Sequence, residues 1–271
     1  MRLLFLLLTT FFPFSLFAVN LEIDMGAGVH YAGAKGTLVY TKELWKDSSG
    51  VIDHEVSTNG YMWINIKPDE KYWPNVRLEV TQYKSSGDSF IHIVGGSLID
   101  GLISAIETQV PLVSINDRYY SSRLTLNEYE AFFFYDFYTE SKNASCGVGF
   151  GLKKFVFDYS VTIIDGLAFS DNGGGTAPLL FFTSAYKFSE KSEEIQSSVS
   201  GDAKVYVFGD STIYEYLVKL DFTKQYNATT ELGIEMGFKE TYYDIQGSDI
   251  VNVGGNMKSA GAFVGIVARF K

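Results

Sequence analysis

Residues 229–244 alternate between apolar and polar side chains with a period of two. One face carries Leu232, Ile234, Met236 and Phe238, and the other carries Glu231, Glu235 and Lys239 between glycines. A half-buried strand of a soluble protein shows the same alternation, but such strands are usually only about five or six residues long. The length of this segment favours a strand that crosses a membrane in a closed barrel.

Ten segments of the chain show this kind of alternation between turn signals. They are residues 21–31, 61–67, 76–83, 123–138, 147–164, 179–188, 198–208, 213–223, 229–244 and 260–270. The sequence therefore predicts an all-β fold: an antiparallel transmembrane β-barrel of about ten strands that occupies residues 19–271. An even number of strands is typical of bacterial barrels, and it returns the C-terminus to the side of the N-terminus. A soluble periplasmic β-sandwich is the alternative fold.

The connections between these segments alternate in length, as short periplasmic turns and long outer loops do in such barrels. We expect short turns at residues 68–75, 139–145, 189–196 and 225–228, and long outer loops at residues 33–59, 85–121, 165–177 and 246–258. The triplet Gly173–Gly175 and the pair Gly254–Gly255 are interpreted as loop tips.

One segment conflicts with a simple alternation. Gly147, Gly149 and Gly151 share a parity with Phe155 further along. Because one strand face is not expected to carry both the glycines and lipid-facing aromatic residues, we expect a β-bulge near Lys153–Lys154.

The first eighteen residues have the form of a cleaved signal peptide. Arg2 supplies the positive charge, Leu3 to Leu8 begin the apolar stretch, and Ala18 is a suitable small residue at the cleavage site. The later chain contains no apolar run of about twenty residues, the length that a transmembrane helix needs. A closed barrel is therefore the expected way for residues 19–271 to cross a membrane, and we expect export to the outer membrane of a Gram-negative bacterium.

The composition limits the classes of partner that this chain could bind. The net charge of −10 argues against nucleic acid, whose phosphates would repel the chain. The 18 tyrosines and 22 phenylalanines suit the aromatic girdles of a membrane barrel. The alternation that ends at Phe270 resembles the C-terminal signal read by the barrel-assembly machinery, although Lys271 follows it. We expect a monomer in the lipid bilayer of the outer membrane, assembled by that machinery.

Charged residues gather on the faces predicted to line the lumen, because charges would be costly on the lipid face. The candidate lumen charges are Glu22, Asp24, Arg77, Glu79, Glu128, Glu130, Lys219, Asp221, Glu231, Glu235, Lys239 and Arg269. They form either a cation-preferring path or a salt-bridged plug. A narrow barrel favours the plug, since a lumen of about eight strands is just filled by side chains.

The three histidines offer the only hint of catalysis. A histidine beside a serine or a carboxylate can act as a general base. His54, between Asp53 and Glu55, and His92, in a predicted long loop, are candidates for a site on the outer rim. Solvent-exposed loop histidines are the alternative, and the sequence contains no motif for a cofactor or a metal.

Several stretches resemble a family of small Gram-negative outer-membrane β-barrel proteins that is named for a Gly-Gly feature. The resemblance lies in residues 124–130, 149–155, 177–181 and 210–216, and it covers about the C-terminal two-thirds of the chain. It implies the fold and the location, and it carries over no catalytic residue.

These observations favour a barrel that is not an enzyme and that has a structural, adhesive or surface-binding role through its outer loops, mainly residues 33–59 and 85–121. A narrow, porin-like, cation-preferring channel is the first alternative. An outer-membrane hydrolase with a rim active site is the second.

Overall fold

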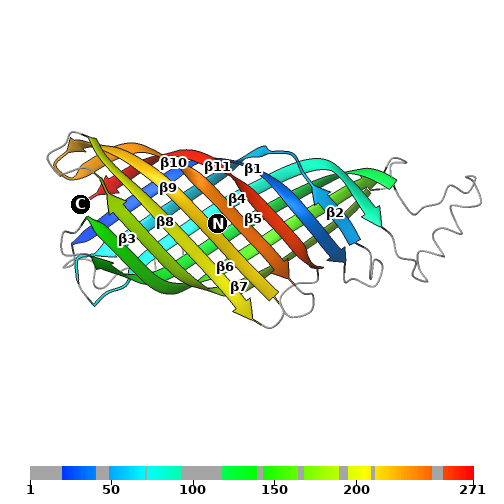
Figure 1. The fold of residues 1–271 in the computed structure, drawn as a ribbon, viewed down its shortest axis with the longest axis horizontal. Helices are drawn as coiled ribbons and strands as arrows, with labels where there is room; N and C mark the ends of the chain where they lie inside the picture. Colours follow the sequence, from blue (N-terminus) through cyan, green and yellow to red (C-terminus); the bar gives the residue numbers. More distant parts are fainter. Residues whose placement is uncertain are drawn as a thin grey trace, which may run out of the picture.

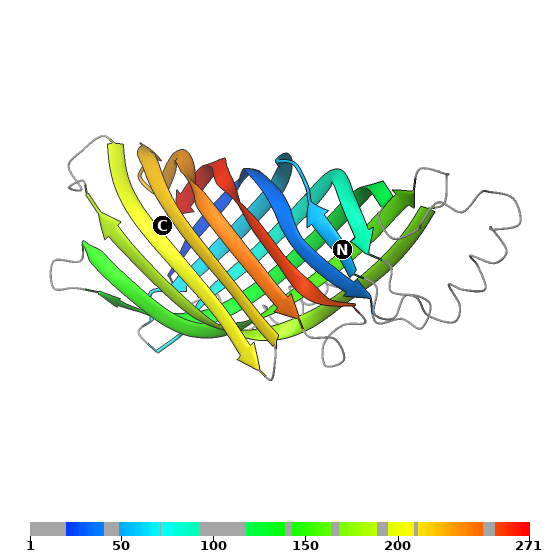
Figure 2. The same cartoon turned by 45° about the vertical axis from the view of Figure 1, so that its right-hand side comes forward.

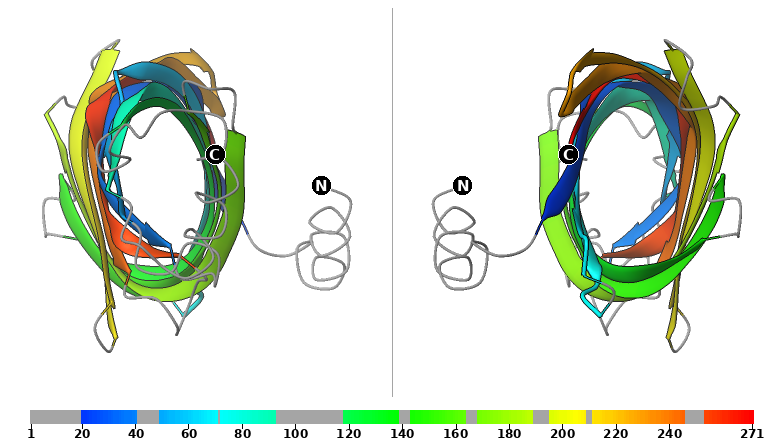
Figure 3. Two further views of the ribbon diagram at one scale, coloured as in Figure 1. Left: turned by 90° about the vertical axis from the view of Figure 1, so that its right-hand side faces the viewer. Right: turned by 90° about the vertical axis from the view of Figure 1, so that its left-hand side faces the viewer.

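The computed structural model describes residues 20–40, 49–70, 72–92, 118–138, 143–163, 168–188, 195–208, 211–245 and 253–271. They form one closed antiparallel β-barrel, and none of them is helical (Figures 1 and 3). No helix in this part of the chain is long and apolar enough to cross a membrane. The predicted signal peptide, residues 1–18, lies outside the described residues.

All ten predicted strands are present, and most are longer than predicted. The strands are β1 (Leu21–Tyr40), β2 (Ser49–Asp53), β3 (Ser57–Pro68), β4 (Asn75–His92), β5 (Arg118–Tyr138), β6 (Ala144–Ile163), β7 (Ala168–Lys187), β8 (Ile195–Phe208), β9 (Ser211–Asn227), β10 (Thr230–Ile245) and β11 (Val253–Phe270). The barrel closes because β1 pairs with both β11 and β3. The prediction of a ten-stranded antiparallel barrel is confirmed, with β2 and β3 sharing one position in the ring.

The pairing register fixes the slope of the strands. A path along paired residues runs through Tyr186, Val199, Leu220, Met236, Val264, Val29, Gly60, Gln82, Asn127, Val156 and Gly174. It leaves β7 at Tyr186 and returns to it at Gly174, twelve residues earlier. With about 3.3 Å per residue and 4.8 Å between strands, this stagger tilts the strands by about 40° from the barrel axis.

A β-bulge separates β2 from β3. Ala32 pairs with Ser57 and Lys35 pairs with Asp53, so three residues of the bulged strand oppose two of β1. The extra residue reverses the parity of the strand: His54 points inward, whereas Glu55 and Val56 are exposed. The bulge therefore lies within residues 33–59, the segment that was predicted to be an outer loop.

The bulge predicted near Lys153–Lys154 is wrong. The register of β6 against β5 continues without a shift through both residues. Gly147, Gly149, Gly151, Lys153 and Phe155 all face the lumen, and Phe155 is 1% exposed. The prediction failed because it assumed that an aromatic side chain of a barrel strand must face lipid.

Parts of the predicted outer loops are strands. Gly173–Gly175 lie within β7, paired with Phe155–Phe157, and Gly254–Gly255 lie within β11, so neither is a loop tip. The predicted loop 33–59 contains the end of β1, all of β2 and the start of β3, and residues 41–48 lie outside the described part. The predicted loop 85–121 contains the end of β4 and the start of β5, and residues 93–117 lie outside it.

The barrel consists of two halves with opposite polarity. The membrane half is the half that contains the start of β1 and the end of β11 (left in Figure 1). Its outward side chains are apolar. They include Met25, Met62, Phe133, Phe150, Leu152, Leu180, Phe182, Val218, Leu232, Ile234, Phe238, Val264 and Ile266. This belt spans nine residues of β5, from Tyr129 to Phe137, which matches the length of a tilted membrane strand.

In the outer half most exposed outward side chains are polar or charged. They include Lys35, Lys84, Arg123, Lys154, Asp158 and Lys258. Such residues are unfavourable against hydrocarbon and favourable in water, so this half lies beyond the membrane. The wall of strands therefore continues beyond the lipid.

Candidate functional site in the barrel lumen

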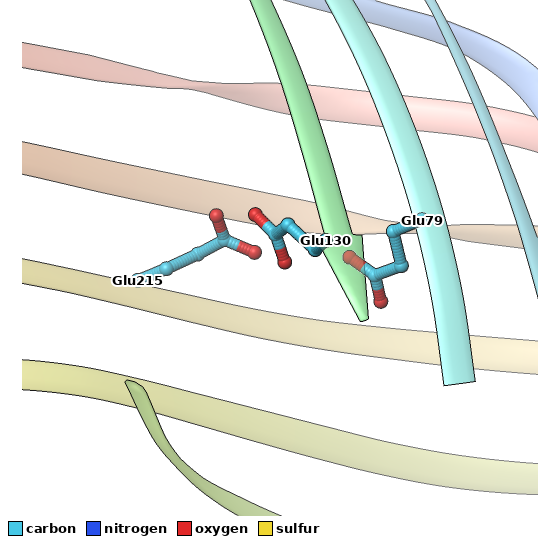
Figure 4. A group of neighbouring side chains, drawn as sticks. All are labelled: Glu79, Glu130 and Glu215. Carbon is cyan, nitrogen blue, oxygen red and sulfur yellow. The ribbon is translucent and has the colours of Figure 1, made fainter. Parts of the chain in front are cut away.

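Three glutamates from three strands converge at the centre of the lumen (Figure 4). Carboxylate oxygens of Glu79 on β4, Glu130 on β5 and Glu215 on β9 lie within 4.8 Å of one another. Lys204 of β8 occupies the point between them, and its Nζ lies 2.5–2.7 Å from one oxygen of each carboxylate. An ammonium group therefore fills the position that a bound cation would need.

Two further lysines complete this glutamate–lysine cluster. Lys153 Nζ lies 3.0 Å from Glu128, 2.9 Å from Glu130 and 3.1 Å from Glu215. Lys239 Nζ lies 3.1 Å from Glu215 and 3.6 Å from Glu128. Three ammonium groups thus face four carboxylates, and all seven side chains are 10% exposed or less.

Arg77 and its carboxylates extend the cluster toward the end of the barrel that holds the start of β1. Its guanidinium contacts Glu79 and lies 3.1 Å from Asp202 Oδ2. The group also stacks 5.4 Å from the ring of Trp63 and 5.9 Å from that of Phe181. A planar cation that is held by both carboxylates and rings has little freedom to move aside for a passing solute.

A second network lies nearer the mouth of the barrel at the start of β1. Glu235, which is fully buried, accepts hydrogen bonds from Tyr61 at 2.8 Å, from Trp63 at 3.0 Å and from Lys219 at 3.0 Å. Asp221 lies 3.1 Å from Arg269, and Lys67 Nζ lies 2.8 Å from Asp24.

The outermost predicted lumen charges lie at the mouth itself. Glu231 contacts Lys271. Glu22 is 43% exposed and lies 3.8 Å from Lys67. The twelve candidate lumen charges thus fall into two connected sets, and Glu22 is the most exposed of them.

Little space remains between the two networks. A cavity of about 30 Å³ is lined by Tyr61, Trp63, Arg77, Glu79, Lys219, Glu235 and Lys239, among others. That volume holds about one or two water molecules. The lumen charges therefore form a packed, ion-paired plug among the described residues, as the narrow-barrel argument predicts.

Above the cluster, the lumen of the outer half is filled by apolar side chains, which we call the apolar plug. Its members include Ile52, Tyr83, Leu124, Leu126, Phe155, Tyr159, Ile213, Ile245 and Met257, each no more than 8% exposed. These residues come from strands on all sides of the ring. The outer half is therefore a hydrophobic core wrapped by a polar sheet, as in a soluble protein.

His54 lies within this apolar plug, although the sequence suggested a site on the rim. Its Nδ1 lies 2.7 Å from Ser85 Oγ and its Nε2 lies 2.6 Å from Ser122 Oγ. Burial lowers the pKa of His54, so the ring is neutral at pH 7. The neighbouring Asp53 and Glu55 are exposed on the other face of the strand, so the predicted pairing of His54 with carboxylates is wrong.

This arrangement gives His54 a structural role. A neutral imidazole has one donor and one acceptor nitrogen, and two hydroxyl groups can match both. The ring thus joins the bulge to β4 and β5. His92 ends β4, and its side chain lies outside the described residues.

The sequence reasoning missed Lys153, Lys204 and Asp202. Lys153 was missed because a bulge was predicted beside it. Lys204 and Asp202 were missed because β8, which carries both, alternates only weakly. A strict parity count along β6 from Gly147 would have placed Lys153 in the lumen.

No family model matches the sequence, and no curated protein matches it. Among solved structures, the chain is similar to the outer membrane protease OmpT from Escherichia coli, with 10% identity, a TM-score of 0.52, and coverage of 92% of this chain and 96% of that one. The chain has the fold of an outer-membrane β-barrel.

Two further matches have lower TM-scores. The transport unit of the autotransporter AIDA-I from Escherichia coli matches with 8% identity and a TM-score of 0.33, over 96% of this chain and 93% of that one. The toluene transporter TodX from Pseudomonas putida matches with 9% identity and a TM-score of 0.29, over 91% of this chain and 89% of that one. None of these comparisons identifies the Gly-Gly family that the sequence resembles.

Proposed function

We propose that this protein is a closed, non-conducting barrel of the Gram-negative outer membrane that holds a binding surface outside the cell. The observation that carries the proposal is the outer half, in which a polar wall encloses an apolar plug. A barrel that served only as an anchor would not need strands that continue about ten residues beyond the belt. Surface binding explains why that part of the chain is kept folded in water.

The plug disfavours the channel. Lys204 holds three carboxylates and Lys153 holds three, so a cation moving along this path would have to displace buried ammonium groups. Removing one partner from such a network leaves uncompensated buried charge, which costs several kcal/mol. The apolar plug above the cluster closes the same path a second time.

No observation favours the hydrolase. Both ring nitrogens of His54 are hydrogen-bonded to serine hydroxyl groups, and the residue is 3% exposed, which disfavours a role as a general base. The likeness to a protease at 10% identity concerns the fold alone.

The remaining expectations from the sequence belong to this proposal. Residues 1–18 direct export and are removed, the barrel-assembly machinery inserts residues 19–271, and the mature protein is a monomer. The Gly-Gly family resemblance supports the same location.

Conductance tests the closed barrel. Refolded protein of residues 19–271 is inserted into a planar lipid bilayer, and its insertion is checked by flotation with vesicles of the same lipid. We expect no discrete current steps at neutral pH. Stable steps with cation preference would overturn the proposal and establish the channel.

Adhesion tests the surface role. Cells that produce the protein are compared with cells lacking it for attachment to a panel of immobilised proteins and polysaccharides. We expect attachment to at least one of them. A closed barrel that confers no attachment across the panel would remove the surface-binding part of the proposal.

A further inference from the structure

Three cations project from the outside of the wall on neighbouring strands of the outer half. They are Lys84 of β4, Arg123 of β5 and Lys154 of β6, and we call them the basic patch. Each is exposed, and the residues just before and after it in its strand are buried in the lumen. β4 pairs with β5 and β5 pairs with β6, so the patch covers one continuous part of the wall, which Figure 2 shows in teal and green.

The register brings hydrogen-bond donors together on this part of the wall. Lys84 and Arg123 are diagonal neighbours across the β4–β5 pair, with about 7–8 Å between their Cα atoms. Lys154 is a diagonal neighbour of Asn127 across the β5–β6 pair. Asn127 accepts a hydrogen bond of 3.0 Å from Gln82. Ammonium, guanidinium and amide groups all donate hydrogen bonds, which suits an anionic ligand.

The charges of the basic patch are not neutralised by neighbours, whereas other exposed lysines of the outer half are. On β1 and β11, Lys35 lies 3.0 Å from Asp53 and Lys258 lies 2.9 Å from Glu240. Within the described part of the chain, no carboxylate forms an ion pair with a member of the patch. Among the described side chains on this face of β4, β5 and β6 beyond the apolar belt, one is acidic, Asp158. The patch is therefore locally positive on a chain whose net charge is −10.

The basic patch begins where the apolar belt ends. On β6, the next outward residue after Leu152, which is 56% exposed, is Lys154. Lys84 and Arg123 lie four and six residues beyond the last apolar outward residues of β4 and β5. With about 3.3 Å per residue and a tilt of about 40°, Lys154, Lys84 and Arg123 lie about 5, 10 and 15 Å above the belt. The headgroup layer of one leaflet is about 5–8 Å thick, so the patch begins within it and extends beyond it.

A hollow on the outside of the wall lies next to Lys154. It has a volume of about 520 Å³ and is lined by Lys154, Val156, Gly174 and Thr176, among others. A Cβ on Gly174 would lie 2.5 Å from the carbonyl oxygen of Phe155, so this position does not accommodate a side chain and the wall stays recessed. The hollow is large enough for a sugar ring, and its lining offers both polar and apolar contacts.

The position of the basic patch identifies the class of its ligand. Lipid headgroups surround the wall directly above the apolar belt, and phosphate is the anionic group that binds lysine and arginine there by charge-assisted hydrogen bonds. A phosphate of a simple phospholipid lies at the level of Lys154. Lys84 and Arg123 stand higher, so one ligand that contacts all three must carry its phosphates on a larger frame, such as a sugar.

We propose that the basic patch binds a phosphorylated glycolipid of the leaflet that surrounds the outer half. Its phosphate groups contact Lys84, Arg123 and Lys154, and a sugar occupies the hollow over Gly174. This inference goes beyond the proposed function and rests on it for one point, the orientation that makes this leaflet the outer one.

The test is native mass spectrometry of the refolded mature barrel in micelles of a neutral detergent, which measures the Kd of the first bound ligand. The probe is diphosphoryl lipid A, and dephosphorylated lipid A, phosphatidylglycerol and inorganic pyrophosphate are compared with it. The variant is Lys84→Gln/Lys154→Gln. The matched control, Lys35→Gln/Lys258→Gln, makes the same change in charge on β1 and β11, and Lys84→Arg/Lys154→Arg keeps the charge. Unchanged unfolding midpoints show that the variants are folded.

We expect Lys84→Gln/Lys154→Gln to weaken the binding of lipid A roughly tenfold or more, because two cations at the membrane surface are lost. The control pair and the arginine pair should bind lipid A like wild type. Dephosphorylated lipid A should bind equally to wild type and to the glutamine variant of the patch. Phosphatidylglycerol and pyrophosphate should bind to wild type more weakly than lipid A does.

Four results would overturn the inference. Equal binding of lipid A to wild type and to Lys84→Gln/Lys154→Gln would remove the site, and equal losses in this variant and the control pair would show attraction without a site. Pyrophosphate bound as tightly as lipid A would exclude a lipid ligand, and phosphatidylglycerol bound as tightly would exclude the sugar.

The proposed function is tested separately. If the barrel is silent in the conductance experiment and promotes attachment, any of these four results removes the glycolipid site and leaves the proposed function standing. Current steps in that experiment overturn the proposed function whatever the lipids do.

Discussion

The two halves of this barrel place apolar and charged side chains on opposite faces of the wall. In the membrane half, apolar residues such as Ile234 and Phe133 face outward and Glu235 and Lys219 fill the lumen. In the outer half, residues such as Lys154 and Arg123 face outward and Phe155 and Leu124 fill the lumen. The backbone is continuous through both, so the solvent around the wall decides which face carries which side chains.

The difference concerns how each interior is stabilised. The lower lumen depends on charge balance, where loss of one partner is costly because its counter-charges stay buried. The upper lumen depends on packed apolar volume, where loss of a side chain leaves a cavity. The same substitution should therefore have different consequences in the two halves.

The largest effect is expected from Lys204→Met. The change removes the ammonium group that holds Glu79, Glu130 and Glu215, and it should lower the free energy of unfolding by roughly 3–5 kcal/mol. Urea unfolding of the protein in lipid vesicles measures it. Lys35→Met is the control, because Lys35 and its partner Asp53 are 77% and 65% exposed and little should change. An equally small effect at Lys204 would show that the cluster does not hold the membrane half together.

Phe155→Ala tests the apolar plug. Phe155 is 1% exposed, and removal of its ring should lower the free energy of unfolding by roughly 3–4 kcal/mol. Its neighbour Val156 faces outward in the outer half, so Val156→Ala is the matched control with a much smaller loss. Similar losses at both positions would contradict the assignment of the lumen as the core of this half.

A lysine scan of the outer surface locates the boundary between the halves. Ile234→Lys places a charge in the middle of the apolar belt and should cost roughly 2–4 kcal/mol. Thr125→Lys makes a similar change on the outward face of β5 in the outer half, and it should be nearly neutral. Comparable costs at the two sites would mean that the belt has been placed wrongly.

The smallest effect concerns pH. Burial keeps the pKa of His54 in the folded state below its usual value, so the unfolded chain takes up the proton first as the pH falls. The contribution of His54 is therefore fully present above its ordinary pKa of about 6.5 and is lost as the pH drops below it. The stability advantage of wild type over His54→Gln should therefore shrink between pH 7.5 and pH 5. A constant difference in unfolding midpoints over that range would exclude this role.

How well each residue of the site could be predicted from the sequence also differed between regions of the barrel. The outward apolar face and inward charges of β10 could be predicted from a period of two, because one side of that strand is lipid. Lys153 was missed, because in β6 both faces are partly apolar and the predicted bulge interrupted the parity count that would have placed it in the lumen. Likewise, a loop and a polar strand in water have similar composition, which is why β2 and the outer end of β7 were predicted as loops.

The sequence by itself predicted a transmembrane barrel of about ten strands, because a closed barrel is the way for alternating strands to satisfy their backbone groups in lipid. Only the tertiary structure decided what the interior does. Whether Glu79, Glu130 and Glu215 line an open path or surround Lys204 depends on the stagger of twelve residues around the ring. The stagger sets which side chains of distant strands meet, and it depends on contacts that no local pattern records.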